Sequence, residues 1–292
     1  MKLVGLLTVR NEQWVLGLTV RAALSAMDEL LVVDHASDDA TPEILAQVAA
    51  EHPGRVHLLR EEDSSWREAA IRQRLLDEAR GRGATHICAL DADEVIAGTL
   101  LPGLRDAFAA LAPGEGLRVP WIDLWRNLDE FRDDSSPFSR SRGILGFRDH
   151  PGVGYRPSDQ GIDIHVRKPK GLLGQRCFPA SREEGGVLHL AYVHGSRIWT
   201  RTVWYKMIEL LRFRDHRTPE QLNEMYHSSY LDETDLRTSP VPPAWWAPYA
   251  ALRNQVDLSA ASWFEQECRR LWNEHGARAF QGLDLWGVVG KV

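Results

Sequence analysis

The chain has 292 residues, 43% of them hydrophobic, enough to build a sizeable core in one or two domains. Its formal net charge is −6, from 35 basic and 41 acidic residues, which argues against a protein that coats nucleic acid. No apolar stretch approaches the roughly 18 residues of a membrane span. The three cysteines are scattered without a pairing pattern, so we expect a protein of the reducing cytoplasm.

Strands and helices are predicted to alternate through the first ninety residues. The pattern favours short buried strands at residues 2–8, 28–33, 55–60 and 85–90, separated by helices at residues 11–27, 41–51 and 66–80. Such regular alternation at short spacing implies right-handed crossover connections. We therefore expect an α/β fold with a parallel sheet in this part of the chain.

Polar side chains follow three of these strands, at the point where each strand ends. They occupy residues 8–12, 34–39 and 91–94. Ligands of open α/β sheets collect at the carboxyl ends of the strands, so these turns predict a nucleotide-type site. The first turn reads Thr-Val-Arg-Asn-Glu and contains no glycine, which argues against a dinucleotide-binding fold or a phosphate-binding loop.

Asp91-Ala92-Asp93 directly follows the apolar run at residues 85–90. Two carboxylates at the end of a buried strand are costly unless a cation or a ligand compensates them. Carboxylate oxygens suit Mg²⁺ or Mn²⁺, and either ion suits a diphosphate. This DxD sequence therefore predicts a metal that neutralises a nucleotide diphosphate.

The three turns in this order resemble the family 2 glycosyltransferases. The similarity lies in Val9-Arg10-Asn11-Glu12, in residues 28–41 with their Asp34-x-x-Ser37-Asp38-Asp39 pattern, and in residues 91–94. It is close over about the first hundred residues and looser at residues 146–148, 164–165 and 188–206. The resemblance implies a GT-A fold, with a mixed sheet, flanking helices and a helical C-terminal extension.

The resemblance also implies a domain organisation and roles for individual residues. Residues 1–200 would form the catalytic domain, with a nucleotide-binding half at 1–95 and an acceptor half at 96–200, and residues 201–292 would pack on it. The expected nucleotide-sugar-binding residues are Thr8, Arg10, Glu12, Asp34, Arg72, Asp91 and Ala92. Asp34 would bind the base or ribose, and Arg72 either reaches the donor or is an ordinary surface arginine.

Metal binding is expected chiefly from Asp93, with Asp91 touching ribose or a metal-bound water. His189 is the candidate third ligand, because an imidazole readily joins two carboxylates. A histidine satisfied within the core or at the surface is the alternative. Mn²⁺ or Mg²⁺ would act as a Lewis acid on the leaving diphosphate.

The resemblance implies inversion at the anomeric carbon, which needs a general base to deprotonate the acceptor hydroxyl. Residues 162–166 are predicted to form a strand with Asp163 and His165 on one face, where they would serve as catalytic residues. The same alternation also fits a half-exposed strand with no catalytic role. Glu183 and Glu184 are rival bases in a loop, and the sequence leaves the choice open.

The second half of the chain carries a basic segment and several helices. Residues 138–182 contain nine Lys or Arg and three Asp, a local charge of 9 − 3 = +6, which is either a solvated face or a surface for an anionic acceptor or donor phosphate. Strands are predicted at residues 117–123 and 187–193, a mobile loop at 126–142, and helices at 201–214, 218–230 and 259–275. The tryptophans of the C-terminal region would pack on the catalytic domain, dock on a membrane surface or mediate dimerisation.

These features together predict a metal-dependent inverting glycosyltransferase with a UDP-sugar as donor. A sugar nucleotidyltransferase and a non-catalytic nucleotide-sugar-binding module are the alternatives; the first lacks its glycine-rich loop here, and the second has no need of the Asp-Ala-Asp sequence. The acceptor stays open among saccharides, lipids, small metabolites and modified DNA, as does the oligomeric state.

Overall fold

The computed structural model describes all residues except 137–138, 160, 214, 228–235 and 291–292. The chain divides into two compact units, each assembled from three segments. The first comprises Met1–Ile122, Arg140–His189 and Pro242–Asp257. The second comprises Asp123–Ser139, Leu190–Val241 and Leu258–Val292. The chain thus passes repeatedly between the units, whereas the sequence suggested one boundary near residue 200.

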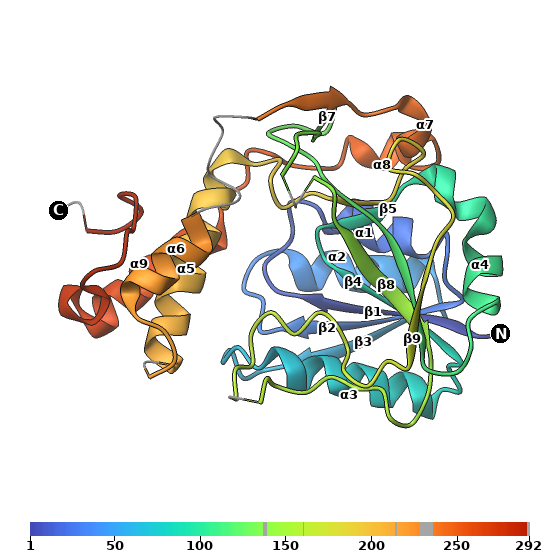
Figure 1. Cartoon of the computed structure of the whole chain (residues 1–292), viewed down its shortest axis with the longest axis horizontal. Helices are drawn as coiled ribbons and strands as arrows, with labels where there is room; N and C mark the ends of the chain where they lie inside the picture. Colours follow the sequence, from blue (N-terminus) through green and yellow to red (C-terminus); the bar gives the residue numbers. More distant parts are fainter. Residues whose placement is uncertain (137–138, 160, 214, 228–235, 291–292) are drawn as a thin grey trace. The chain divides into compact units, whose positions relative to one another are not determined.

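The first four strands form a parallel sheet, as predicted (Figure 1). They are β1 (Leu3–Val9), β2 (Glu29–His35), β3 (Val56–Glu61) and β4 (His86–Asp91), in the order β3-β2-β1-β4. Because the strands run in one direction, their carboxyl ends meet at one edge of the sheet. This edge holds the polar turns singled out in the sequence.

Alternating side chains of β1 and β2 bury both faces of this sheet. Val4 and Leu6 of β1 belong to a buried cluster with Leu75 and Leu76 of helix α3 (Glu68–Gly81). Gly5 lies between them in the strand and faces the other side of the sheet. It packs against Met27 there, since a Cβ at this position would come within 2.2 Å of the Met27 sulfur. Fixing both faces in this way fixes the register, and hence which residues reach the polar edge.

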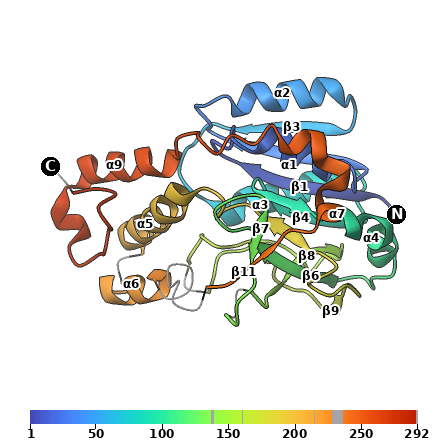
Figure 2. The ribbon, with the colours of Figure 1, turned by 90° about the horizontal axis from the view of Figure 1, so that it is seen from above.

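Further strands make the sheet mixed. They are β5 (Glu94–Ile96), β6 (Glu115–Asp123), β8 (Arg142–Arg148), β9 (Gly174–Cys177) and β10 (Val187–His189), and the order continues from β4 as β8-β6-β10-β5, with β9 beside β6. Figure 2 shows the succession from β3 through β1 and β4 to β8, β6 and β9. Strand β8 runs antiparallel to β4, and a Cβ on Gly146 would lie 2.1 Å from the Ile87 carbonyl oxygen. Only glycine therefore fits at this seam between the two parts of the sheet.

Helices flank the sheet, which confirms the predicted α/β class. Those of the first unit are α1 (Leu16–Ala23), α2 (Thr41–Glu51), α3, α4 (Leu101–Ala109), α7 (Pro243–Trp246) and α8 (Ala250–Arg253), with 3₁₀ turns at Gly98–Leu100 and Ala247–Tyr249. Helix α1 begins five residues later than the predicted position 11. Asn11 adopts a left-handed conformation, φ 52°, and its backbone N–H donates to the Ser37 hydroxyl, so the polar turn replaces the first turns of the helix.

The second unit holds most of the predicted C-terminal helices. Its elements are β7 (Glu130–Arg132), α5 (Gly195–Arg212), α6 (Pro219–His227), β11 (Thr238–Pro240), α9 (Trp263–His275) and a 3₁₀ turn at Ala277–Phe280. Helices α5 and α9 pack together, and β7 pairs with β11. The helical character of this region is confirmed, although the predicted helix at 218–230 extends beyond the described residues. No helix among the residues described has the length and apolar character needed to cross a membrane.

The strand predicted at residues 162–166 is wrong. This segment is irregular, and His165 has φ 59°, a left-handed conformation that no strand accommodates. The alternation of polar and apolar residues has another cause here. Ile162, Ile164 and Val166 are buried while Asp163 and His165 are not, so a loop lying on the core produces the pattern of a half-exposed strand.

Candidate active site

Strand register brings the predicted site residues to one edge of the sheet. Thr8 pairs with Asp91 on one side and with Val33 on the other, and Val9 pairs with Asp34. The ends of β1, β2 and β4 are therefore level with one another. Thr8 and Asp91 are level with each other, and Asp34 lies one residue further along at the same carboxyl edge, where ligands of such sheets collect.

A chain of alternating charges surrounds Asp91. Arg72 of helix α3 donates from Nη2 to Asp91 Oδ1 at 2.5 Å and from Nε to Glu68 Oε1 at 2.9 Å. Arg167 donates from Nη2 to Glu94 Oε2 at 2.7 Å, and its Nε lies 3.5 Å from Asp91 Oδ2. Both oxygens of Asp91 thus face guanidinium groups. Arg72 is buried, so it is not the surface arginine that the sequence allowed.

The pKa values of the two acidic residues Asp91 and Glu94 are shifted in opposite directions. Burial disfavours the charged form of Asp91, but Arg72 and Arg167 outweigh this and hold the pKa of Asp91 well below its usual range. Burial raises the pKa of Glu94 despite the adjacent Arg167 guanidinium. Asp91 is therefore ionised at neutral pH and lies between the two arginine side chains.

Asp93 and His189 are the pair best suited to a metal. His189 lies on β10 beside Glu94 of β5, and its Nε2 is 3.9 Å from Asp93 Oδ1. One carboxylate and one imidazole match the ligand preferences of Mn²⁺. Within the described part of the chain no group of three or more acidic, histidine or cysteine side chains is arranged to hold a metal. These donors therefore fit an ion that takes its remaining ligands from a bound diphosphate and water.

The turns after β1 and β2 are tied together by side-chain hydrogen bonds. The backbone N–H of Glu12 donates to the Thr41 hydroxyl at 2.9 Å, and the Asn11 amide donates to Asp38 Oδ1 at 2.7 Å. Arg10 donates to the Ser64 carbonyl at 2.7 Å, which links the first turn to the segment after β3. The predicted nucleoside-binding residues are therefore held in place before any ligand arrives.

Asp34 and His35 at the end of β2 are both buried and partnered. Asp34 accepts a hydrogen bond from Ser37 N at 3.1 Å and forms an ion pair with Arg60. His35 Nε2 lies 2.9 Å from the Asp63 carbonyl, and burial, aided by Arg10, lowers the pKa of His35. His35 is therefore neutral at pH 7 and donates to this carbonyl from Nε2.

Asp163 lies at the N-terminus of helix α3. Its Oδ1 accepts from Ala69 N at 2.5 Å, and Ala69 is the second residue of that helix, where backbone N–H groups have no partner within the helix. The His165 side chain is exposed. Glu183 and Glu184 are exposed as well, and Glu184 accepts a hydrogen bond from Ser181 N at 2.7 Å.

The sequence did not predict three residues of the charge network around Asp91 as site residues. They are Glu68, Glu94 and Arg167. Glu68 has a recoverable signal, since it precedes Arg72 by one helical turn and such pairs form ion pairs. Glu94 directly follows the Asp-Ala-Asp sequence and belongs to the resemblance, which assigns it no role. Arg167 has no local signal, because it comes from an irregular loop distant in sequence from its partners.

Comparison with known proteins gives one match to a family and several weak structural matches. The family described as Glycosyl transferase family 2 matches residues 6–114. No curated protein sequence matches the chain. The fold is similar to that of S. aureus TarS 1–349 in complex with UDP, at 12% identity and a TM-score of 0.43, covering 80% of this chain and 74% of that one.

Two further solved structures show similarity at the same low level. The mannosyltransferase PcManGT from Pyrobaculum calidifontis, in complex with GDP-Man and Mn²⁺, has 16% identity and a TM-score of 0.43, covering 92% of this chain and 79% of that one. GalNAc-T7 with UDP, GalNAc and Mn²⁺ has 12% identity and a TM-score of 0.39, covering 95% and 58%.

The matched region contains β1 to β4 with the polar turns that follow β1, β2 and β4, and thus the predicted nucleotide-binding residues from Thr8 to Asp93. The close part of the resemblance and the family match thus cover the same region of the chain, whereas the looser part at residues 146–148, 164–165 and 188–206 lies outside the match. The predicted resemblance to the family 2 glycosyltransferases is therefore confirmed over residues 6–114.

Proposed function

We propose that this chain is a metal-dependent, inverting glycosyltransferase of the GT-A type that moves a sugar from a nucleotide diphosphate donor to an acceptor hydroxyl. The observation that carries the proposal is the pairing of two carboxylates with different partners at the end of β4. Asp91 is bound to arginines, and Asp93 faces His189. One carboxylate thus organises the site, while the other is directed to a metal.

In this proposal the Asp93–His189 pair holds Mn²⁺ or Mg²⁺, which supplies charge neutralisation for the leaving diphosphate. Thr8, Arg10 and Glu12 line the nucleoside pocket, and Asp34 hydrogen-bonds the base or ribose. Arg72 and Asp91 with Ala92 shape the floor beneath the donor. Hydrogen bonds placed before binding cost no reorganisation when the donor arrives.

The proposed general base is Asp163, with His165 in the same loop. Asp163 accepts from a helix N-terminus in this structure, which fixes its carboxylate in one orientation. Its action as a base requires the acceptor hydroxyl to approach the same carboxylate. UDP-sugars are the first donors to test, because the sequence resemblance suggested them.

The test of the proposed function is donor binding and turnover with and without metal. We expect one nucleotide sugar in a panel of UDP- and GDP-sugars to raise the melting temperature in the presence of Mn²⁺ and to have little effect in EDTA. A donor at a hundred times its dissociation constant adds about 2.7 kcal/mol to the stability. Slow donor hydrolysis with release of an inverted sugar, detected by NMR, would separate an enzyme from a binding module.

The alternatives make different predictions in the same assays. A nucleotidyltransferase would release pyrophosphate from a nucleoside triphosphate and a sugar phosphate. A binding module would show the thermal shift without hydrolysis under any condition. Failure of every nucleotide sugar to shift the melting temperature would overturn the proposed function.

A further inference from the structure

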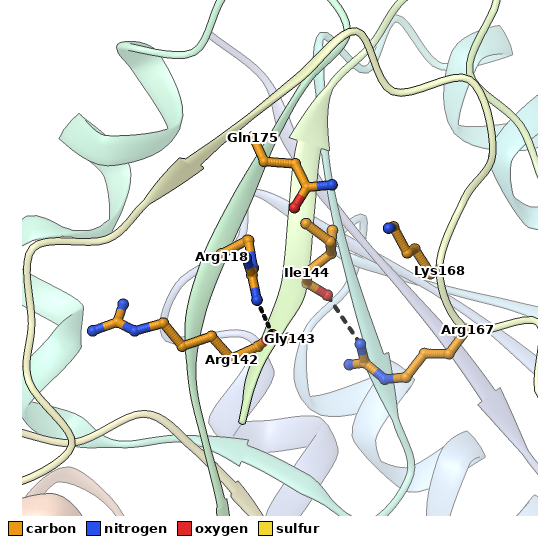
Figure 3. A pocket seen from close by; sticks show the side chains of 7 residues that line it. All are labelled: Arg118, Arg142, Gly143, Ile144, Arg167, Lys168 and Gln175. Atoms are coloured by element: carbon orange, nitrogen blue, oxygen red, sulfur yellow. Dashed lines mark hydrogen bonds between the residues drawn. The ribbon is translucent and has the colours of Figure 1, made fainter. Parts of the chain in front are cut away.

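A basic cavity lies on the antiparallel part of the sheet in the first unit. Its volume is about 340 Å³, and it is lined by Arg118, Arg142, Gly143, Ile144, Arg167, Lys168 and Gln175 (Figure 3). Four of these seven residues are basic and none is acidic. Apart from Arg118, they come from the segment whose local charge of +6 stood out in the sequence. The cavity therefore attracts anions.

The four cations differ in how their charges are already engaged. Arg142 donates to the carbonyls of Phe178 and Ala180, and its guanidinium points away from Lys168 in Figure 3. Arg167 is paired with Glu94. The charges of Arg142 and Arg167 thus add to the positive potential of the cavity, but their N–H groups are largely engaged by these partners.

Arg118 and Lys168 remain available to a ligand. Arg118 donates at 3.0 Å to the main-chain carbonyl of Arg142, a neutral acceptor. Within the described residues neither Arg118 nor Lys168 forms an ion pair with a carboxylate. Figure 3 shows the two residues on opposite sides of Ile144, with the Lys168 ammonium directed towards it and the Gln175 amide nearby.

The wall of the cavity is held by Trp121. A Cβ on Gly143 would lie 2.5 Å from Cε3 of this ring, so the glycine backbone packs directly on the indole. The Arg167 guanidinium carbon lies 4.0 Å from the centroid of the same ring, within the range of a cation–π contact. The cavity is therefore built into the fold, and its shape does not depend on a ligand.

Arg167 connects this cavity to the candidate active site. Its Nη1 donates to the Ile144 carbonyl at 3.0 Å, and its Nε is 3.5 Å from Asp91 Oδ2. One guanidinium thus separates the basic cavity from the carboxylates at the end of β4. The lining residues, from Arg118 onwards, lie outside the family-matched residues 6–114 that carry the nucleotide-binding turns.

We propose that this cavity binds a phosphate monoester carried by the acceptor, with Arg118 and Lys168 as its charge partners and Gln175 as an additional hydrogen-bond donor. The proposal deepens the proposed function and rests on it. Two available cations match a phosphate monoester, whose charge near pH 7 is about −1.5 to −2. A cavity of this volume, at the small end of ligand sites, suits a phosphate with one attached sugar.

The experiment measures binding of inorganic phosphate and of glucose 6-phosphate by calorimetry, with glucose as the uncharged probe. The variants are Arg118→Gln, Lys168→Gln and the double variant. Arg176→Gln is the matched control, because Arg176 follows Gln175 on β9, does not line the cavity and pairs with Glu115. We expect the double variant to lose at least tenfold in affinity for both phosphates, and Arg176→Gln to bind as the parent does.

Donor binding in the same variants separates the two proposals. Binding of UDP with Mn²⁺ should be unchanged in Lys168→Gln, because this side chain is exposed and forms no ion pair within the described residues. An equal loss of UDP and phosphate binding would assign the cavity to the donor diphosphate and overturn the acceptor proposal. Unaltered phosphate affinity in the double variant, or no phosphate binding by the parent, would also overturn it. Phosphate binding that depends on Lys168 in a protein that binds no nucleotide sugar would instead refute the proposed function.

Discussion

Nη2 of Arg72 lies 2.5 Å from Oδ1 of Asp91, and the same guanidinium reaches Glu68 one helical turn earlier. Helix α3 and strand β4 are consecutive elements, so this contact ties a buried helix face to the end of the strand that carries the Asp-Ala-Asp sequence. A guanidinium buried between two carboxylates is stable only while both partners stay in place. The position of Asp91 therefore depends on the packing of α3.

Arg72→Gln should lower the free energy of unfolding by about 3–5 kcal/mol, because it leaves the buried Glu68 without its arginine and Asp91 with Arg167 alone. Urea denaturation followed by circular dichroism measures the loss. Arg74→Gln is the control, since Arg74 is exposed and its ion pair with Glu61 spans 3.4 Å. A change below about 1 kcal/mol for Arg72→Gln would mean that water replaces the guanidinium.

Asp93→Asn should remove the dependence of donor binding on Mn²⁺, because it weakens the metal pair formed with His189. Binding of metal and of donor is coupled, so each should tighten the other by the same factor in the parent protein. Titrations of UDP with and without Mn²⁺ measure that factor. Asp77→Asn, an exposed change on α3, should leave it intact. Parent-level transfer by Asp93→Asn in EDTA would show that no metal is needed.

Asp34→Ala should weaken donor binding by about 1.5–3 kcal/mol, the range for a hydrogen bond to a charged group. The partner Arg60 offers a control, because Arg60→Gln removes the ion pair and keeps the carboxylate. Calorimetry should therefore show a large loss for Asp34→Ala and a small change for Arg60→Gln. Equal losses would make the ion pair a structural clamp with no direct role in recognition.

Two substitutions at Asp163 separate helix capping from catalysis. Asp163→Asn keeps an oxygen acceptor for Ala69 N, whereas Asp163→Ala removes it and should cost about 1–2 kcal/mol of stability, as the loss of a helix cap does. If Asp163 is the base, both variants should lose about 10²–10⁴-fold in transfer rate. The double variant Glu183→Gln/Glu184→Gln should transfer normally. Full activity of Asp163→Asn would leave capping as the function of Asp163.

Asp134 in the second unit should make stability depend on acidic pH. Burial opposes its charge, but hydrogen bonds from Ser136 and Arg132 outweigh this and lower the pKa of Asp134 from its ordinary value of 3.8 to about 2. The stabilisation is thus present above pH 4 and is lost as the pH falls towards 2, with a size of about 2 kcal/mol. Asp134→Asn should therefore destabilise the protein at pH 7 and much less near pH 2. Denaturation curves that show the same deficit at both values would contradict this.

The sequence predicted the parallel half of the sheet because its signals are local. Each strand there is a short apolar run followed by a polar turn, and Thr41-Pro42-Glu43 marks the start of its helix, which runs to Glu51. It also predicted that Asp34 and Asp91 lie at one edge of the sheet, since parallel register places the ends of β1, β2 and β4 together. What it could not supply were contacts between distant segments, such as Arg167 with Glu94, which depend on how the loop at residue 167 crosses the sheet.

The pattern at residues 162–166 failed for a physical reason. Alternation of apolar and polar residues reports only which side chains are buried, and an irregular loop lying on a core gives the same result as a strand. The left-handed backbone at His165 has only a weak sequence signal, since histidine adopts it more often than most non-glycine residues but in a small fraction of cases. The role of Asp163 as the base stays a prediction, and its contact with the N-terminus of α3 could only be found in the structure.

Arg167, which pairs with Glu94 and lies beside Asp91, is synthesised later than both of them. Chain synthesis proceeds from the N-terminus, so β1 to β4 and helix α3 leave the ribosome well before residue 167. Arg72 can then pair with Asp91. Glu94, which is buried in the complete protein, has no partner until Arg167 has been synthesised. The charge network around Asp91 is therefore completed only after the parallel strands have been synthesised. A fragment limited to residues 6–114 would lack Arg167, and Glu94 would have no arginine partner in it.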